Sequence, residues 1–176
     1  MKFLVHSSET VHQNPWYHIR HDTFTRPNQT NGEYFVIEFP GSCFVIAKRN
    51  NDLLVCRQYR YTIDMDDLEF VGGRIDPGES PEEAAKRELK EEAGLKTASL
   101  RFLGKISVLN GAAKSWAHVF IADTFTSADP ETEQDEFELK TEWMPITEFE
   151  KRIRQNEIVD AETLAAWALY ISKERV

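Results

Sequence analysis

The sequence predicts an α+β fold in two parts, an N-terminal β extension over residues 1–40 and a larger domain over residues 41–176. Short apolar runs separated by turn residues, which are typical of strands, occupy most of the chain, and helical periodicity follows at its C-terminal end. A capped helix at about 81–93 interrupts the strands. The 176 residues allow one substantial core with a small appendage.

Two strands are expected in the extension, at 16–24 and at Tyr34–Phe39, with a turn-rich stretch between them that makes a hairpin. Two strands alone are marginally stable in water, so the hairpin must pack on its own domain or on a second subunit. Trp16, Tyr17 and Phe24 are the natural contacts. These aromatic side chains either fill the local core or serve in dimerisation or base stacking.

The larger domain begins with a predicted hairpin, Phe44–Lys48 and Leu53–Arg57, joined by the turn residues 50–52. Further strands are expected at 69–72, 100–103, 106–109 and 116–122, with a turn at Asn110-Gly111. Two packing helices follow, one capped by Thr147 and running to about 155, the other capped by Asp160 and running to about 173, with Trp167 in the core.

The helix at 81–93 carries unusually complete end signals. Ser80 is the expected N-cap, Pro81 suits the first helical position, and Glu83 completes a capping box. Gly94 suits the left-handed position that ends the helix.

Three carboxylates, Glu88, Glu91 and Glu92, share one face of this helix. Like charges at this spacing repel by a few tenths of a kcal/mol per pair, so a divalent cation between them would explain their proximity. The competing interpretation is a solvated acidic helix face. The spacing of the surrounding residues favours the cation.

Five residues separate Gly73 from Glu79, and seven separate Glu79 from Arg87. Arg87 begins the stretch RELKEEAGL. This pattern closely resembles the Nudix box of the Nudix hydrolase family. The resemblance implies an α/β/α sandwich with a mixed central sheet, in which residues 41–176 form the catalytic domain. It also implies that the protein is an enzyme, a pyrophosphohydrolase.

The resemblance also implies a metal site. Glu88 and Glu92 would be the principal ligands of Mg²⁺ or Mn²⁺, Glu91 would complete the cluster, and the carbonyl of Gly72 would add a ligand; oxygen donors suit these ions better than zinc. Glu79 would pair with Arg87 to fix the loop on the helix. The resemblance gives the two glycines of the motif, Gly73 and Gly94, structural roles.

Outside the box, the chain is similar to the ADP-ribose and nucleoside-diphosphate-sugar pyrophosphatase branch. The matching pieces are Asn14-Pro15-Trp16, Arg57-Gln58-Tyr59-Arg60, Glu69 with Gly72-Gly73, and the stretch from Ile158 to Ala166. This implies a homodimer formed through the N-terminal strands and a base bound by Trp16. Arg57, Arg60 and Glu69 are the other expected substrate contacts, and Arg60 is favoured for phosphate because a guanidinium can hold two oxygens at once.

The attacking water needs a base, because the box glutamates are occupied as ligands. The acidic stretch 129–138 offers Glu133, which the resemblance favours, or Glu136; if this stretch is only a solvated loop, Glu91 or metal-bound water must serve.

Net charge of −9 argues against a nucleic-acid partner and favours a small molecule. Cys43 and Cys56 lie in apolar runs and are expected to be buried and reduced. No membrane span and no signal-peptide core are visible, so we expect a cytoplasmic protein.

The expected reaction is metal-dependent hydrolysis of the pyrophosphate bond of an ADP-ribose or nucleoside-diphosphate-sugar substrate, giving a nucleoside monophosphate and a sugar phosphate. The alternatives are a hydrolase of dinucleoside polyphosphates, nucleoside triphosphates or capped RNA, and a Nudix module that senses a nucleotide without cleaving it.

Overall fold

The computed structural model describes residues 2–129 and 139–174. The chain divides into two compact units, one made of the residues up to Gly41 together with Ser107–Trp116, the other of Ser42–Ile106 together with Ala117–Val176. The predicted boundary at residue 40 stays a prediction. No helix among the described residues is long and apolar enough to cross a membrane.

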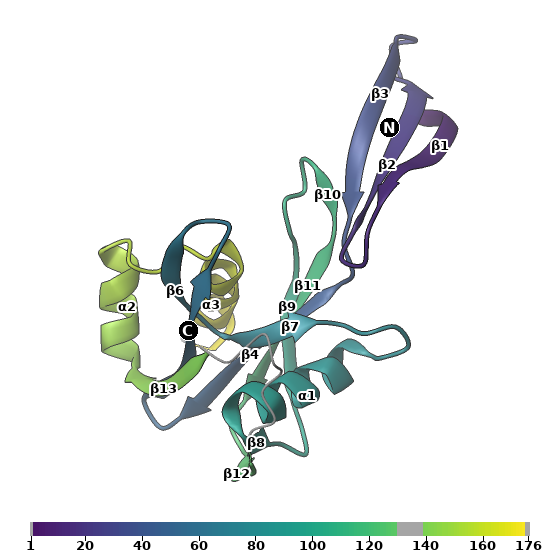
Figure 1. Cartoon of the computed structure of the whole chain (residues 1–176). Helices are drawn as coiled ribbons and strands as arrows, with labels where there is room; N and C mark the ends of the chain where they lie inside the picture. Colours follow the sequence, from purple (N-terminus) through teal and green to yellow (C-terminus); the bar gives the residue numbers. More distant parts are fainter. Residues whose placement is uncertain (1, 130–138, 175–176) are drawn as a thin grey trace. The chain divides into compact units, whose positions relative to one another are not determined.

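The first unit is a four-stranded sheet in the order β1-β2-β3-β10. Its strands are β1 (Leu4–Gln13), β2 (His18–Thr25), β3 (Asn31–Glu38) and β10 (Ala113–Lys114) (Figure 1). Strands β2 and β3 are the predicted hairpin, which is confirmed, and β1 adds an antiparallel strand that the sequence did not predict. The short β10 pairs with β3 in parallel.

The three aromatic residues singled out in the extension differ in their environments. Phe24 is buried and stacks on Phe3 with 4.8 Å between ring centroids, so it belongs to the local core of this unit. Tyr17 is partly buried against Phe39. Trp16 keeps 68% of its surface exposed and remains available for contact.

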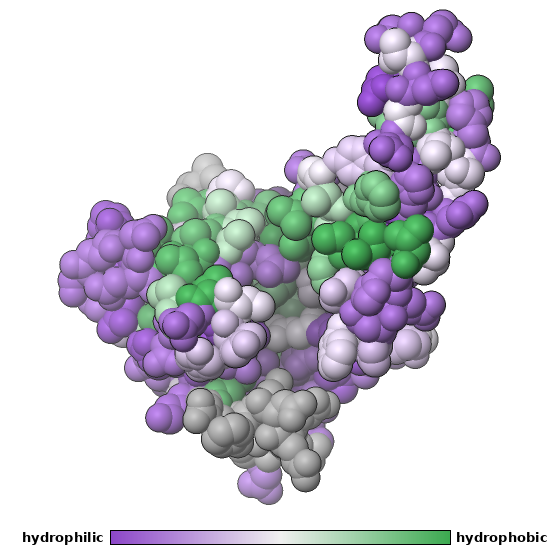
Figure 2. All heavy atoms as spheres, turned by 45° about the horizontal axis from the view of Figure 1, so that its top comes forward, coloured by the Kyte–Doolittle hydropathy of each residue, from purple (hydrophilic) through white to green (hydrophobic). Residues whose placement is uncertain are grey.

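Several large apolar side chains of the first unit stay exposed: Phe3, Leu4, Val5, Val11, Tyr34, Phe35 and Phe39. On the face of the molecule drawn in Figure 2, apolar side chains gather in patches on a surface that is otherwise largely hydrophilic.

The second unit is built on a seven-stranded mixed sheet with the main order β13-β5-β4-β11-β9. Its strands are β4 (Ser42–Arg49), β5 (Asp52–Arg60), β6 (Met65–Glu69), β7 (Val71–Arg74), β9 (Arg101–Ser107), β11 (Trp116–Ala122) and β13 (Lys140–Pro145). A separate two-stranded sheet pairs β8 (Leu95–Lys96) with β12 (Thr126–Ser127).

In the predicted first hairpin, the two strands pair with each other only next to the turn. Lys48 faces Leu53 and Arg49 faces Asp52, next to a turn in which Asn50 takes a left-handed φ of 55°. Beyond this point β4 pairs with β7 and β11, whereas β5 pairs with β6 and β13. The two strands therefore separate and each extends its own part of the sheet.

Alternate residues of these central strands face two different hydrophobic layers. Ile46 and Val55 pack with α2 (Ile146–Arg154) and α3 (Ala161–Glu174), in a cluster that includes Phe149 and Trp167. Val45 and Leu54 pack with α1 (Pro81–Ala93), whose Leu89 is fully buried. Figure 1 shows α1 apart from α2 and α3, with strands between them. This is the predicted α/β/α arrangement.

The ends of α1 follow the sequence signals. The hydroxyl of Ser80 accepts from the N–H of Glu83, whose carboxylate accepts from the N–H of Ser80, and Gly94 ends the helix at φ 60°. For α3, the Asp160 carboxylate accepts from the N–H of Thr163 at 2.7 Å, as predicted. Trp167 is buried in the core, also as predicted.

Three predicted boundaries were wrong. Helix α2 begins at Ile146, directly after Pro145, and has no side-chain cap. The predicted cap Thr147 is therefore inside the helix, because the helix starts one residue earlier, where the side chain of Ile146 is buried in the core. The expected strands 100–103 and 106–109 are one strand, β9, which bends into the turn before β10. The expected strand 69–72 is divided at Phe70 between β6 and β7, because each half pairs with a different strand.

Candidate active site

The site is organised around β7, where the backbone comes unusually close to its neighbours. A Cβ atom on Gly72 would lie 2.3 Å from the carbonyl oxygen of Cys43 on the paired strand β4. A Cβ atom on Gly73 would lie 2.3 Å from Oε1 of Glu88. Side chains at either position would collide, so two consecutive glycines let α1 bring its carboxylates against this strand.

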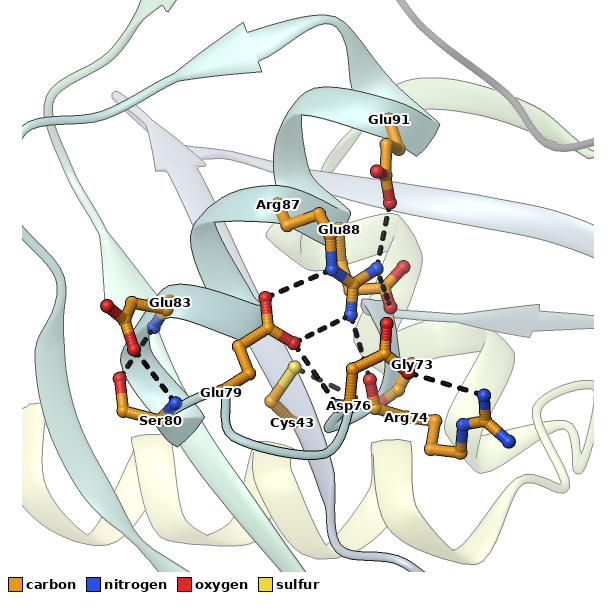
Figure 3. Close-up of polar contacts among 10 residues, drawn as sticks. All are labelled: Cys43, Gly73, Arg74, Asp76, Glu79, Ser80, Glu83, Arg87, Glu88 and Glu91. Atoms are coloured by element: carbon orange, nitrogen blue, oxygen red, sulfur yellow. Dashed lines mark hydrogen bonds and ion pairs between the residues drawn. The ribbon is translucent and has the colours of Figure 1, made fainter. Parts of the chain in front are cut away.

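Arg87 is the centre of the hydrogen-bond network in Figure 3. Its Nε and Nη2 donate to the two carboxylate oxygens of Glu79, both at 3.1 Å, and Nη2 also donates to the carbonyl oxygen of Arg74 at 2.9 Å. Its Nη1 donates to Glu88 at 2.7 Å and to Glu91 at 2.9 Å. Every N–H of the guanidinium is thereby used. The bonds to Glu79, then those to Glu91 and Glu88, raise the pKa of Arg87 well above its usual range.

The loop before the helix is held at several points. The Glu79 carboxylate, besides its pair with Arg87, accepts from the N–H of Asp76 at 3.2 Å. Asp76 in turn pairs with Arg74 at 3.3 Å. The pairing of Glu79 with Arg87 that the sequence predicts is present, and it ties the loop 74–79 to the second turn of α1.

Glu88 and Glu92 are buried carboxylates, 7% and 8% exposed. Glu92 Oε2 accepts from the N–H of Gly72 at 3.4 Å and from the thiol of Cys56 at 3.5 Å. Both side chains therefore lie against the Gly72-Gly73 backbone. Charged side chains are rarely fully buried unless they are paired, and Glu88 is paired with Arg87 at 2.7 Å.

These donors fit a hard divalent cation. Two carboxylates and the neighbouring backbone supply only oxygen, and Mg²⁺ is commonly held by one or two carboxylates completed by water and substrate phosphates. Among the described residues, no group of three or more His, Cys, Asp or Glu side chains is arranged to hold a metal ion. Glu91, predicted as the third carboxylate, is engaged with Arg87.

Neither cysteine competes for this role. Both are buried and free of disulfides, as predicted. Burial raises the pKa of the Cys43 thiol to about 12, and its Sγ donates to the carbonyl of Gly73 at 3.7 Å. A thiol that stays protonated is neither a nucleophile nor a metal ligand.

A cavity of about 640 Å³ borders Gly72 and Gly73 in the second unit. Arg60 and Glu69, both predicted as substrate contacts, line it and form a bidentate ion pair through Nε and Nη2 of the arginine. This bond raises the pKa of Arg60. Arg57, the other arginine considered, does not line the cavity and instead approaches Glu142 at 3.8 Å.

The sequence reasoning missed three acidic residues of this cavity, Asp67, Asp160 and Glu162. Asp160 and Glu162 lie at the start of α3, where they were interpreted only as parts of a packing helix. Burial, followed by the negative charges of Asp160 and Glu69, raises the pKa of Glu162 to about 7. Only the resemblance of the stretch from Ile158 to Ala166 pointed to this segment, and it carried no role for Glu162.

The remaining predicted residues lie elsewhere. In the first unit, Trp16 lines a cavity of about 350 Å³ together with Tyr17, Phe39 and Lys114. Glu133 and Glu136, the predicted bases, lie outside the described residues.

Comparisons with known proteins agree with this geometry. The model of the NUDIX domain matches residues 39–166, most of the chain. The chain belongs to the Nudix family. A second family model, described as the nucleoside diphosphate sugar hydrolase N-terminal domain, matches residues 4–37.

Relatives of this Nudix chain include an ADP-ribose pyrophosphatase of Mycobacterium tuberculosis, 29% identical over 90% of this chain and 78% of the relative. Another is the ADP compounds hydrolase NudE of Escherichia coli, 30% identical over 71% of this chain and 66% of the relative. The fold is also that of a crystal structure of an ADP compounds hydrolase. The match has a TM-score of 0.86 at 24% identity and covers 100% of this chain and 98% of the hydrolase chain. The chain is thus a Nudix hydrolase similar to ADP-ribose pyrophosphatases.

Proposed function

We propose that this Nudix hydrolase cleaves the pyrophosphate bond of a nucleoside diphosphate linked to a sugar, ADP-ribose among them, and releases a nucleoside monophosphate and a sugar phosphate. The observation that carries the proposal is the pair of buried carboxylates, Glu88 and Glu92, set against the Gly72-Gly73 backbone beside a large cavity. The similarity to ADP-ribose pyrophosphatases supports the substrate class.

Glu88 and Glu92, with the Gly72 carbonyl, would hold Mg²⁺ or Mn²⁺, and Glu91 would join them on release from Arg87. When bound, such an ion neutralises phosphoryl charge and lowers the pKa of a coordinated water. Arg87 would keep Glu88 aimed at the strand through its 2.7 Å hydrogen bond.

Arg60 would orient the pyrophosphate. Two of its N–H groups bind Glu69, which fixes the guanidinium plane at the wall of the cavity, and the remaining donors have no partner among the described residues. A guanidinium fixed in this way binds a phosphate oxygen with little loss of side-chain entropy. Arg57 is the weaker candidate because Glu142 competes for it.

Glu133 or Glu136 would accept the proton of the attacking water, with Glu91 as the further alternative. The two can be separated with Glu133→Gln and Glu136→Gln: the base should lower turnover at every magnesium concentration, whereas excess metal should partly rescue a ligand variant.

The proposal includes a homodimer formed through the β1-β2-β3 sheet, with Trp16 stacking on the base. It rests on the exposed apolar side chains of that sheet, because a monomer would leave them in water. Light scattering that gives the 20.4 kDa monomer at micromolar concentration would refute it. A cytoplasmic location is also proposed and is supported by two buried cysteines that form no disulfide.

The function is tested by a hydrolysis panel of ADP-ribose, nucleotide sugars, nucleoside triphosphates and diadenosine polyphosphates with magnesium, in water enriched in ¹⁸O. Mass spectrometry of both products identifies the substrate and the phosphorus attacked. Preferential cleavage of the triphosphates or of the diadenosine compounds would overturn the proposal, and binding without any cleavage would indicate a sensor module.

A further inference from the structure

The candidate site is divided between two pairs of strands that separate from each other. Strands β4 and β5 pair only next to their turn. Beyond it, β7 pairs with β4 and carries Gly72 and Gly73 to the carboxylates of α1, and these three elements are here called the metal half. Strand β6 pairs with β5, and Glu69 on β6 binds Arg60 on β5; these two strands are the arginine half.

Phe70 is the residue at which the chain crosses from the arginine half to the metal half. The ladder between β5 and β6 ends at Glu69, and the ladder between β4 and β7 begins at Val71. Phe70 belongs to neither ladder and is only 2% exposed, so its N–H needs an acceptor from another part of the chain. The backbone conformation at Phe70 also affects how the two halves are spaced, because it joins Glu69 directly to β7.

The acceptor is the hydroxyl of Thr163, in the first turn of α3. Its Oγ1 accepts from the N–H of Phe70 at 3.1 Å, across 93 positions of sequence. Thr163 is fully buried, so water cannot replace the hydroxyl without a rearrangement of the core. A buried N–H that loses its acceptor bears the full cost of its desolvation, and the bond is therefore a specific tie between α3 and the crossing at Phe70.

Two carboxylates hold Thr163 in this place. The Asp160 carboxylate accepts from the N–H of Thr163 at 2.7 Å, which caps α3 and fixes its first turn. On β6, Oδ1 of the buried Asp67 accepts from the N–H of Val159 at 3.2 Å. The start of α3 is thus bonded both to β6 and to the crossing at Phe70, so the hydroxyl cannot shift without breaking other buried hydrogen bonds.

We propose that Thr163 is a positioning residue, which sets the spacing between the metal half and the arginine half so that one pyrophosphate contacts both. The inference rests on the proposed function, since it assumes that a cation on α1 and the guanidinium of Arg60 bind the same group. Thr163 is fully buried and acts only through Phe70. A displacement of about 1 Å between groups that act together can lower turnover about 10²-fold, so one such bond can control the rate.

The test compares Thr163→Val, which removes the acceptor at nearly constant volume, with Thr163→Ser, which keeps it. The substrate is ADP-ribose or the tightest-binding nucleotide of the hydrolysis panel. Thr163→Val should lower kcat about tenfold or more, whereas Thr163→Ser should stay within about threefold of the wild type. Binding of Mn²⁺, measured by electron paramagnetic resonance, should stay within about twofold in both variants, because the ligands of the metal half keep their places relative to one another.

A double-mutant cycle with Arg60→Lys separates positioning from a general loss of stability. In the wild-type background Arg60→Lys should lower kcat/KM about tenfold or more, because a lysine cannot bind both Glu69 and phosphate in the geometry of a guanidinium. In the Thr163→Val background the loss should be at least about threefold smaller, since the arginine half is already misplaced. Ile121→Val, in the core on β11, is the control: its effect should multiply with that of Arg60→Lys without coupling.

Uncoupled losses in the cycle, equal losses in Thr163→Val and Thr163→Ser, or Mn²⁺ binding that falls together with turnover would each overturn the inference. Should Thr163→Val not fold, Thr163→Ala replaces it in the cycle, because alanine places no methyl group against the N–H of Phe70. Coupling in the dissociation constants of a nucleotide that binds but is not cleaved, measured by calorimetry with Ca²⁺, would support the inference and refute the proposed reaction. Binding of no nucleotide of the panel would refute both.

Discussion

Two groups of polar side chains border the Gly72-Gly73 segment, and they differ in how completely their hydrogen bonds are made. Around Arg87 every N–H of the guanidinium has an acceptor. In the neighbouring cavity, Arg60 uses two of its N–H groups to bind Glu69, and its other N–H groups have no acceptor among the described residues. The first group is complete within the chain and acts as a framework, whereas the second keeps N–H donors that the proposed substrate would use.

The largest expected effect comes from removing a ligand charge next to the framework. Glu92→Gln is nearly isosteric and should keep the fold, but turnover of ADP-ribose should fall on the order of 10³-fold because a carboxylate that holds the cation is lost. Glu82→Gln is the control, since Glu82 lies on the same helix and pairs with Lys86 on the surface. Near-normal turnover of Glu92→Gln at saturating magnesium would exclude Glu92 as a ligand.

Arg87→Lys tests whether the framework depends on the shape of the guanidinium. A lysine keeps the charge but cannot reach Glu79, Glu88, Glu91 and the Arg74 carbonyl together. We expect a loss of roughly 2 kcal/mol in the free energy of unfolding and about 10²-fold in turnover. Urea unfolding and steady-state kinetics measure the two. A variant as stable and as active as the wild type would show that charge alone is sufficient.

The two glycines give a matched pair with opposite outcomes. Gly72→Ala places a Cβ against a backbone carbonyl, which cannot yield, so the protein should lose stability. Gly73→Ala meets the end of the flexible Glu88 side chain, which can turn away. The second variant should unfold nearly as the wild type does but lose about tenfold or more in turnover. Equal losses of stability in both variants would contradict this distinction.

The smallest effect tests the cavity through pH. The pKa of Glu162 is raised from 4.5 to about 7, so the folded protein binds its proton more tightly than the unfolded chain does. The resulting stability is present in full below pH 4.5 and is lost as pH rises through about 7. Between pH 5 and pH 8 the wild type should lose on the order of 1 kcal/mol relative to Glu162→Gln, after allowance for solvent screening.

Urea midpoints of both proteins at the two pH values, with Glu157→Gln as control, measure the difference. A constant difference between wild type and Glu162→Gln across this range would mean that Glu162 titrates as an ordinary surface carboxylate.

The sequence could predict the group around Arg87 but not the cavity. The framework lies within one continuous stretch, so the helix caps could be predicted from the residues themselves, and the resemblance to the Nudix box supplied the Glu79–Arg87 pair and the structural role of Gly73. Strand β1 was missed because its apolar residues do not alternate regularly, and β13 because four of its positions are polar or proline. The cavity was missed because it joins Asp67 to Glu162 across a long separation in sequence, which only the fold brings together.

The central claim is that the Glu88–Glu92 face of α1 holds the cation that supports hydrolysis. Binding of Mn²⁺ measured by electron paramagnetic resonance tests it without relying on activity. The wild type should remove free Mn²⁺ from solution at micromolar to millimolar concentrations, EDTA should abolish ADP-ribose hydrolysis, and Glu88→Gln combined with Glu92→Gln should bind at least about tenfold more weakly than Glu82→Gln. Unchanged Mn²⁺ binding in the double variant, or a strict requirement for zinc, would contradict it.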